Sequence, residues 1–129
     1  MGFLIVFLGA GLGGACRHGV NLLAVRLLGL AFPYGTLTVN LVGCFLMGFI
    51  AEWWALRSSL PQPVRLFLTT GLLGGFTTFS AFSLDVALLW EQGRAAAAAL
   101  YATTSVVLSI GALFLGLALV RALLARGAA

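Results

Sequence analysis

Four apolar stretches separated by short polar connections make up most of this 129-residue chain. Each is close to the ~20 residues that an α-helix needs to cross a bilayer. Charged residues are 8% of the chain, whereas a soluble domain carries roughly 25%. We therefore expect an all-α integral membrane protein with a single domain over residues 1–129. The four helices are expected at about Phe3–Leu28, Tyr34–Leu56, Val64–Trp90 and Ala95–Leu119.

The positive charges lie mostly near the ends of the apolar stretches. They form no basic stripe that would hold a nucleic acid, and their placement fits anchoring at the lipid headgroups of a bilayer. Counting the arginines near the segment ends gives only a weak bias between the two sides of the membrane. Such a chain could insert both ways and pair antiparallel with a second copy, or adopt one orientation fixed by other factors. One side would hold Arg57, Arg65, Arg121 and Arg126, and the other Arg26 and Arg94, with Arg17 unassigned.

The third stretch contains the sequence GLLGGFTTFSAFS, which is unfavourable for a continuous helix. Gly74 and Gly75 lower the helix propensity. Thr77 and Thr78 are β-branched, and their hydroxyls compete for backbone carbonyls. An interrupted helix in lipid is tolerated only where the freed backbone faces protein, water or an ion. We therefore predict an interruption here that forms the functional site.

Neutral hydrogen-bonding side chains occur in the second and fourth stretches. Asn40 needs partners, because an amide group is costly to place in hydrocarbon. Tyr101, Ser105 and Ser109 are four residues apart and so share one face of a helix. These groups could join helices by hydrogen bonds, or they could line a path for an anion.

The type of ion follows from the charges expected inside the bundle. Glu52 and Glu91 lie at segment ends and Asp85 lies close to one, so no carboxylate is expected at the membrane midplane. A proton-coupled cation transporter would need one there. Neutral donors favour an anion, as do the positive ring edges of Phe79 and Phe82. Carbonyls freed at the interruption would instead suit a small cation such as Na⁺.

The first stretch combines small residues with one arginine. Gly11, Ala15 and Gly19 have the four-residue spacing of closely packed membrane helices, which predicts a packing face. Arg17 is either a functional residue within the membrane or a side chain that reaches the headgroups. The sequence leaves both interpretations of Arg17 open.

The GLLGGFTTFSAFS stretch, the TLTVNLVGCF stretch and the glycine-rich start ending in Arg17 together resemble the CrcB/Fluc family of microbial fluoride channels. The resemblance covers essentially the whole chain. It implies a multi-pass protein of the bacterial or archaeal inner membrane that exports F⁻ passively and reduces its toxicity. It also implies an antiparallel dual-topology homodimer with a structural Na⁺ at its interface. The implied Na⁺ ligands are the backbone carbonyls of Gly74 and Thr77, and the implied fluoride pore residues are Asn40, Phe79, Ser80, Phe82, Tyr101, Ser105 and Ser109.

Three other functional classes can be weighed against a channel. We expect no enzyme, because no nucleophile–base pair or metal-ligand cluster is visible. Cys16 and Cys44 lie in apolar stretches and are expected to behave as small hydrophobic residues. The alternative of a small multidrug-type dual-topology transporter predicts a carboxylate in the first stretch, which has none. A non-transporting assembly protein would use its polar residues only to pack helices.

Overall fold

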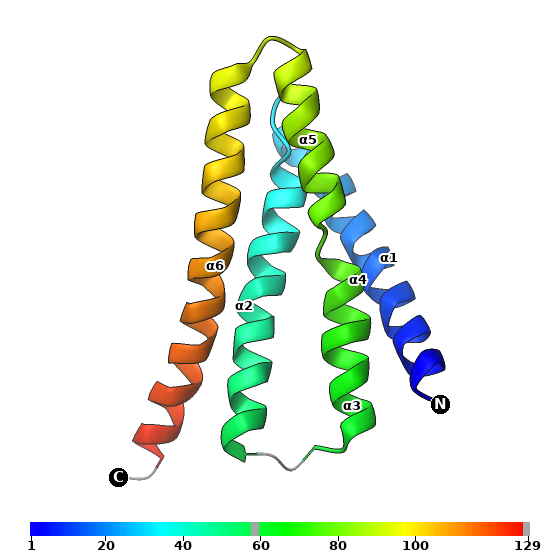
Figure 1. The fold of residues 1–129 in the computed structure, drawn as a ribbon, viewed down its shortest axis with the longest axis vertical. Coiled ribbons are helices and arrows are strands. Elements are labelled where there is room, and N and C mark those ends of the chain that lie inside the picture. Colours follow the sequence, from blue (N-terminus) through cyan, green and yellow to red (C-terminus); the bar gives the residue numbers. More distant parts are fainter. Residues whose placement is uncertain (58–59, 128–129) are drawn as a thin grey trace.

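The computed structural model describes residues 1–57 and 60–127, and every regular element in that part is helical. Four helical segments are long and apolar enough to cross a membrane, as predicted. They run alternately up and down in an elongated bundle (Figure 1). The first, second and fourth are α1 (Gly2–Leu28), α2 (Tyr34–Arg57) and α6 (Ala95–Arg126). The third comprises α3 (Gln62–Leu66), the π-helix η1 (Phe67–Leu73), α4 (Gly74–Phe76) and α5 (Phe79–Glu91).

Two connections meet at one end of the bundle. Gly29 ends α1 with φ of 81°, and Gly93 follows α5 with φ of 74°. Both values lie in the left-handed region, where glycine is favoured because it has no Cβ. The Arg94 guanidinium donates a hydrogen bond of 2.6 Å to the carbonyl of Ala31, which joins the two connections.

Glycine allows the helix backbones to approach one another closely at two places. On α1, a Cβ atom at Gly9 or Gly13 would collide with the backbone of η1. On α2 and α6, a Cβ atom at Gly48 or Gly116 would collide with the backbone of the facing helix. These are the short-range contacts that small residues permit between membrane helices.

The packing face predicted for α1 was assigned to the wrong side of that helix within one chain. A Cβ atom at Gly11 or Gly19 would meet nothing within 4 Å, and Ala15 is exposed. Gly9 and Gly13 have the same four-residue spacing but begin two residues earlier. A shift of two residues rotates the face by about 200°, so the face that packs within the chain is the opposite one, and the predicted face is open in the single chain.

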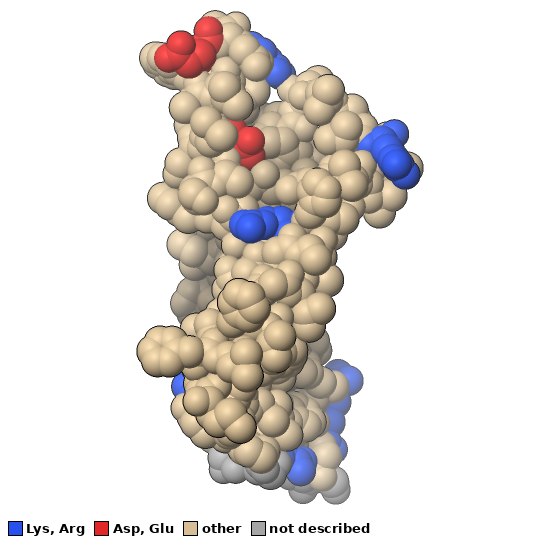
Figure 2. Space-filling view, turned by 90° about the vertical axis from the view of Figure 1, so that its right-hand side faces the viewer, with Lys and Arg blue, Asp and Glu red and all other residues tan. Residues whose placement is uncertain are grey.

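The interior of the single chain is small, and most large apolar side chains face outward. A core cluster joins α5 to α6 through Phe82, Leu89, Ala98 and Tyr101. Figure 2 shows an uncharged surface across the lower middle of the molecule, with charged side chains above and below it. This distribution fits a bundle surrounded by lipid.

Candidate functional site

Two extended residues lie between α4 and α5, near the middle of the bundle (Figure 1). Thr77 has φ and ψ of −82° and 160°, and Thr78 has −155° and 123°. The Thr78 hydroxyl accepts a hydrogen bond of 3.1 Å from the N–H of Ala81 and so caps α5. The threonine pair thus ends one helix and begins the next.

Asn40 of α2 binds the backbone of Thr78 through both ends of its amide group. Its Oδ1 accepts from the Thr78 N–H at 2.8 Å, and its Nδ2 donates to the Thr78 carbonyl at 3.0 Å. The bond to the Thr78 N–H replaces the helical partner that this extended residue lacks, while the Thr78 carbonyl, as the N-cap carbonyl of α5, also accepts the first bond of that helix. One Nδ2 hydrogen remains for another acceptor. Asn40 therefore positions the interruption and retains one donor.

The two carbonyls predicted to bind a cation differ in their surroundings. In a continuous helix, the Gly74 carbonyl would accept from the N–H of Thr78, but that N–H donates to Asn40. The Thr77 carbonyl accepts a long hydrogen bond of 3.4 Å from Nη1 of Arg17. Arg17 thus reaches the interruption from α1.

A cavity of about 290 Å³ lies beside the interruption. Its walls come from α2, α5, α6 and the two extended residues. It brings together five of the predicted pore residues and five other residues. The lining residues are Asn40, Cys44, Thr77, Thr78, Phe79, Phe82, Ser105, Val106, Ser109 and Ile110.

Two hydroxyl groups in this cavity lack a protein partner. Oγ of Ser105 and Oγ of Ser109 are buried and have no hydrogen bond within the described residues. Ser105 as a whole is 4% exposed. Buried polar groups are almost always paired, so an unpaired hydroxyl that lines a cavity indicates a partner from outside the chain.

Two phenylalanines lie at the start of α5, and one of them is buried while the other is exposed in the single chain. Phe79 and Phe82 have ring centroids 5.4 Å apart and planes tilted by 52°. Phe82 is 8% exposed and packs against Tyr101, whereas Phe79 is 76% exposed. Both rings line the cavity, but one side of Phe79 faces outward from the single chain.

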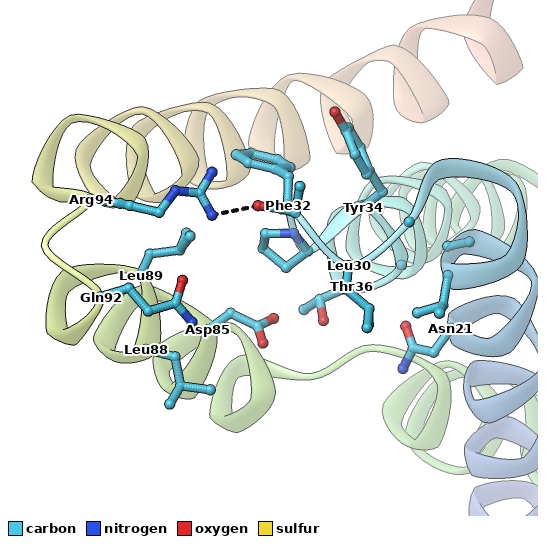
Figure 3. A pocket seen from close by; sticks show the side chains of 16 residues that line it. Asn21, Leu30, Phe32, Tyr34, Thr36, Asp85, Leu88, Leu89, Gln92 and Arg94 are labelled. Carbon is cyan, nitrogen blue, oxygen red and sulfur yellow. Dashed lines mark hydrogen bonds between the residues drawn. The ribbon is translucent and has the colours of Figure 1, made fainter.

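Tyr101 contacts one residue of this cavity, Phe82, and one residue of a second, more polar cavity, Asp85. Its ring is fully buried, and its hydroxyl donates to Oδ2 of Asp85 at 3.2 Å. Asp85 faces the second cavity, which has a volume of about 350 Å³ and also contains Asn21, Thr36 and Arg94 (Figure 3). The Tyr101 hydroxyl is therefore engaged by a carboxylate on the side of the polar cavity.

Ser80 lies at the interruption, where its hydroxyl is within hydrogen-bond distance of a neighbouring side chain. Its hydroxyl is 3.2 Å from that of Thr78, and the residue is exposed in the single chain. The predicted pore residues therefore divide by environment. Asn40, Phe79, Phe82, Ser105 and Ser109 surround the cavity, while Ser80 and Tyr101 bind neighbouring side chains.

Three residues at the site were missed in the sequence analysis. Asp85 was set aside because it is near a segment end, yet its position three residues after Phe82 places it on the same helix face. Thr78 was considered only as a helix breaker, although a threonine before a helical run is a common N-cap. Cys44 follows Asn40 by four residues, a spacing that would have shown it to share the Asn40 face.

The described residues hold no group of three or more His, Cys, Asp or Glu side chains that could bind a metal ion. A cation at the interruption would therefore depend on backbone oxygen atoms or on the neutral side-chain oxygens of Asn40 and the two threonines. Carbonyl oxygens suit hard monovalent cations, so the chemistry of Gly74 and Thr77 is compatible with Na⁺. Arg17 competes for the Thr77 carbonyl.

Four apolar helices, with a largely apolar cavity beside the interruption that also holds a few neutral donors, define a multi-pass helical membrane protein. Residues 4–117 match the model of a family described as CrcB-like protein, Camphor Resistance (CrcB). The chain belongs to this CrcB-like family.

Relatives in several bacteria align over nearly their whole length. The chain is 59% identical over 124 residues to the fluoride-specific ion channel FluC of Granulibacter bethesdensis, covering 96% of this chain and 98% of the relative. It is 56% identical over 121 residues to the fluoride-specific ion channel FluC 2 of Nitrobacter hamburgensis, covering 94% and 98%. It is 55% identical over 123 residues to the fluoride-specific ion channel FluC of Rhodopseudomonas palustris, covering 95% and 99%.

Proposed function

We propose that this protein is a fluoride-selective passive channel that exports F⁻ across the cytoplasmic membrane and so reduces its toxicity. The observation that carries the proposal is the pair of unpartnered hydroxyls, Ser105 and Ser109, in a cavity inside a membrane protein. The names of relatives at 55–59% identity support fluoride as the ion. A channel needs no catalytic group, and we do not assign an enzyme activity.

The chemistry of the cavity favours a small anion over a cation. Its lining contains hydroxyls and an amide but no carboxylate. An ion that leaves water needs replacements for its hydration shell, and F⁻ accepts strong hydrogen bonds from such donors. A hydrogen bond to a charged group contributes roughly 1.5–3 kcal/mol. The positive ring edges of Phe79 and Phe82 add to this attraction.

The decisive experiment is ion efflux from liposomes that contain the purified protein. Vesicles loaded with F⁻ should release it when a counter-ion pathway is opened, and identical vesicles loaded with Cl⁻ should retain their contents. Protein-free vesicles control for leakage. Absence of F⁻ release, or equal release of Cl⁻, would overturn the proposed function.

A second copy of the chain in antiparallel orientation would complete the site. Phe79 is 76% exposed although it lines the cavity, and a partner subunit would cover its outer side. The stripe of Gly11, Ala15 and Gly19 offers a second open face where another helix could approach closely. The weak arginine bias is compatible with both orientations in one membrane.

The carbonyls of Gly74 and Thr77 would hold a structural Na⁺ at the interface of this dimer. Two chains together would offer four oxygen atoms, enough to enclose a monovalent cation. A bound cation at this depth would raise the local positive potential and attract an anion to the adjacent cavity. Arg17 would lose its long hydrogen bond to Thr77 when that carbonyl turns to the ion.

The relatives with FluC names are bacterial, which supports placement in a bacterial inner membrane. A small multidrug-type transporter gains no support. It would require a carboxylate in the first helix, and the first acidic residue of the sequence is Glu52 at the end of α2.

A further inference from the structure

A free thiol lies on the wall of the cavity that contains the unpartnered hydroxyls. Cys44 is half-buried on α2 and forms no disulfide. It follows Asn40 by four residues, so the two side chains lie on one face of the helix. Both residues line the cavity of about 290 Å³ beside the interruption.

An independent observation indicates that a ligand occupies the space next to this thiol. Ser105 of α6 is 4% exposed, lines the same cavity, and has an Oγ without a hydrogen-bond partner in the described residues. Cys44 comes from a different helix, α2, so the thiol and the hydroxyl contribute to two walls of one space. An ion that passes along the Ser105 wall therefore passes Cys44 as well.

We propose that Cys44 is a wall residue of the conduction pathway, and that a thiophilic monovalent cation bound to its sulfur blocks the channel. The inference depends on the proposed channel function. With Ag⁺, the S–H bond breaks, the proton leaves to water and an S–Ag bond forms, with no change in oxidation state. The bound metal ion fills part of the cavity and retains an anion that would otherwise move on.

Cys16 provides a matched control within the same chain. It is also a free cysteine, but it is exposed on α1 and is not among the residues lining the cavity. Metal bound at Cys16 would remain outside the pathway. If the block by silver depends on Cys44 and not on Cys16, a thiol alone does not explain it. The result would then show that the Cys44 thiol lies in the cavity.

The test measures F⁻ efflux with a fluoride electrode in chloride-free medium, because chloride would precipitate silver. The wild type, Cys16→Ser and Cys44→Ser are compared before and after addition of AgNO₃. We expect Ag⁺ to reduce efflux at least tenfold in the wild type and in Cys16→Ser, and less than twofold in Cys44→Ser. Unchanged efflux in the wild type, or an equal block in Cys44→Ser, would overturn the inference alone.

Absence of F⁻ efflux before silver is added would overturn the channel function and the inference with it. If Cys44→Ser does not fold, Cys16→Ser alone gives the answer, because it retains Cys44 as its single thiol. Its efflux should fall as one Ag⁺ per chain is titrated, and should recover when dithiothreitol removes the metal. Binding of one equivalent without loss of efflux would refute the assignment.

Discussion

Replacing Ser105 with alanine separates a conducting role from a packing role. Oγ of Ser105 is buried and has no partner in the described residues, and a buried unpaired hydroxyl costs about 1–3 kcal/mol. Alanine removes that cost and gains up to about 0.5 kcal/mol in helix propensity. The space left by one oxygen atom is smaller than a methyl group and costs less than about 1 kcal/mol. We therefore expect the free energy of unfolding of Ser105→Ala to rise by about 1–2 kcal/mol.

Conduction should change in the opposite direction. If the hydroxyl donates to F⁻, its loss removes a hydrogen bond to a charged group, which contributes roughly 1.5–3 kcal/mol. At 1.4 kcal/mol for each factor of ten, F⁻ efflux from liposomes should fall about ten- to a hundredfold. Tryptophan fluorescence during unfolding in detergent reports stability on the same preparation. The variant is expected to be more stable and less active.

Thr104→Val is the matched control on the same helix. The Thr104 hydroxyl donates to the carbonyl of Leu100 at 2.7 Å, so its hydrogen bond stays within α6. We expect its F⁻ efflux to remain within twofold of the wild type. A Ser105→Ala protein that is less stable than the wild type and conducts normally would refute the reasoning. It would mean that the hydroxyl has a protein partner and serves only to pack helices.

Four other changes test the remaining parts of the site. Phe79→Ala and Phe82→Ala should each lower F⁻ efflux at least tenfold while leaving the proposed dimer intact by size-exclusion chromatography; unaltered efflux would remove that ring from the pathway. Asn40→Ala leaves the Thr78 N–H without its partner, so the free energy of unfolding should fall by about 1–3 kcal/mol. A change below about 0.5 kcal/mol would show that this bond does not hold the interruption. Replacing Na⁺ by a bulky organic cation should impair efflux, and equal rates in both media would count against a structural Na⁺.

The number, length and class of the helices could be predicted because hydropathy alone determines them. Each predicted helix end in the first three segments lies within two residues of the observed one, but α6 continues to Arg126, seven residues beyond the expected Leu119. The extension includes Arg121, which pairs with Glu52 of α2 at 2.6 Å. An ion pair between helices is invisible to a hydropathy pattern, since it depends on which helices are neighbours.

The partners of the polar side chains could not be predicted from the sequence. Spacing placed Tyr101 and Ser105 on one face of a helix, yet the first donates to Asp85 and the second has no partner among the described residues. The difference comes from α5. This helix places the Asp85 carboxylate opposite the Tyr101 hydroxyl, whereas it places the Phe82 ring in the same cavity as Ser105. Periodicity within one helix contains no information about the helix that packs against it.

The division between paired and unpaired donors bears on how the site conducts. A donor that is already bound within the chain must break that bond before it can serve an ion, which raises the barrier to passage. Asn40 binds the backbone of Thr78 through its Oδ1 and one of its two Nδ2 hydrogens, and the Tyr101 hydroxyl donates its hydrogen bond to Asp85. Within the described residues, Oγ of Ser105 and Oγ of Ser109 have no hydrogen bond of good geometry to break, although Ser105 lies beside Tyr101 and Ser109 beside Cys44. Under the proposed function, ion stabilisation would therefore fall on these two serines and on the remaining Nδ2–H of Asn40, while the Tyr101 hydroxyl stays bound to Asp85.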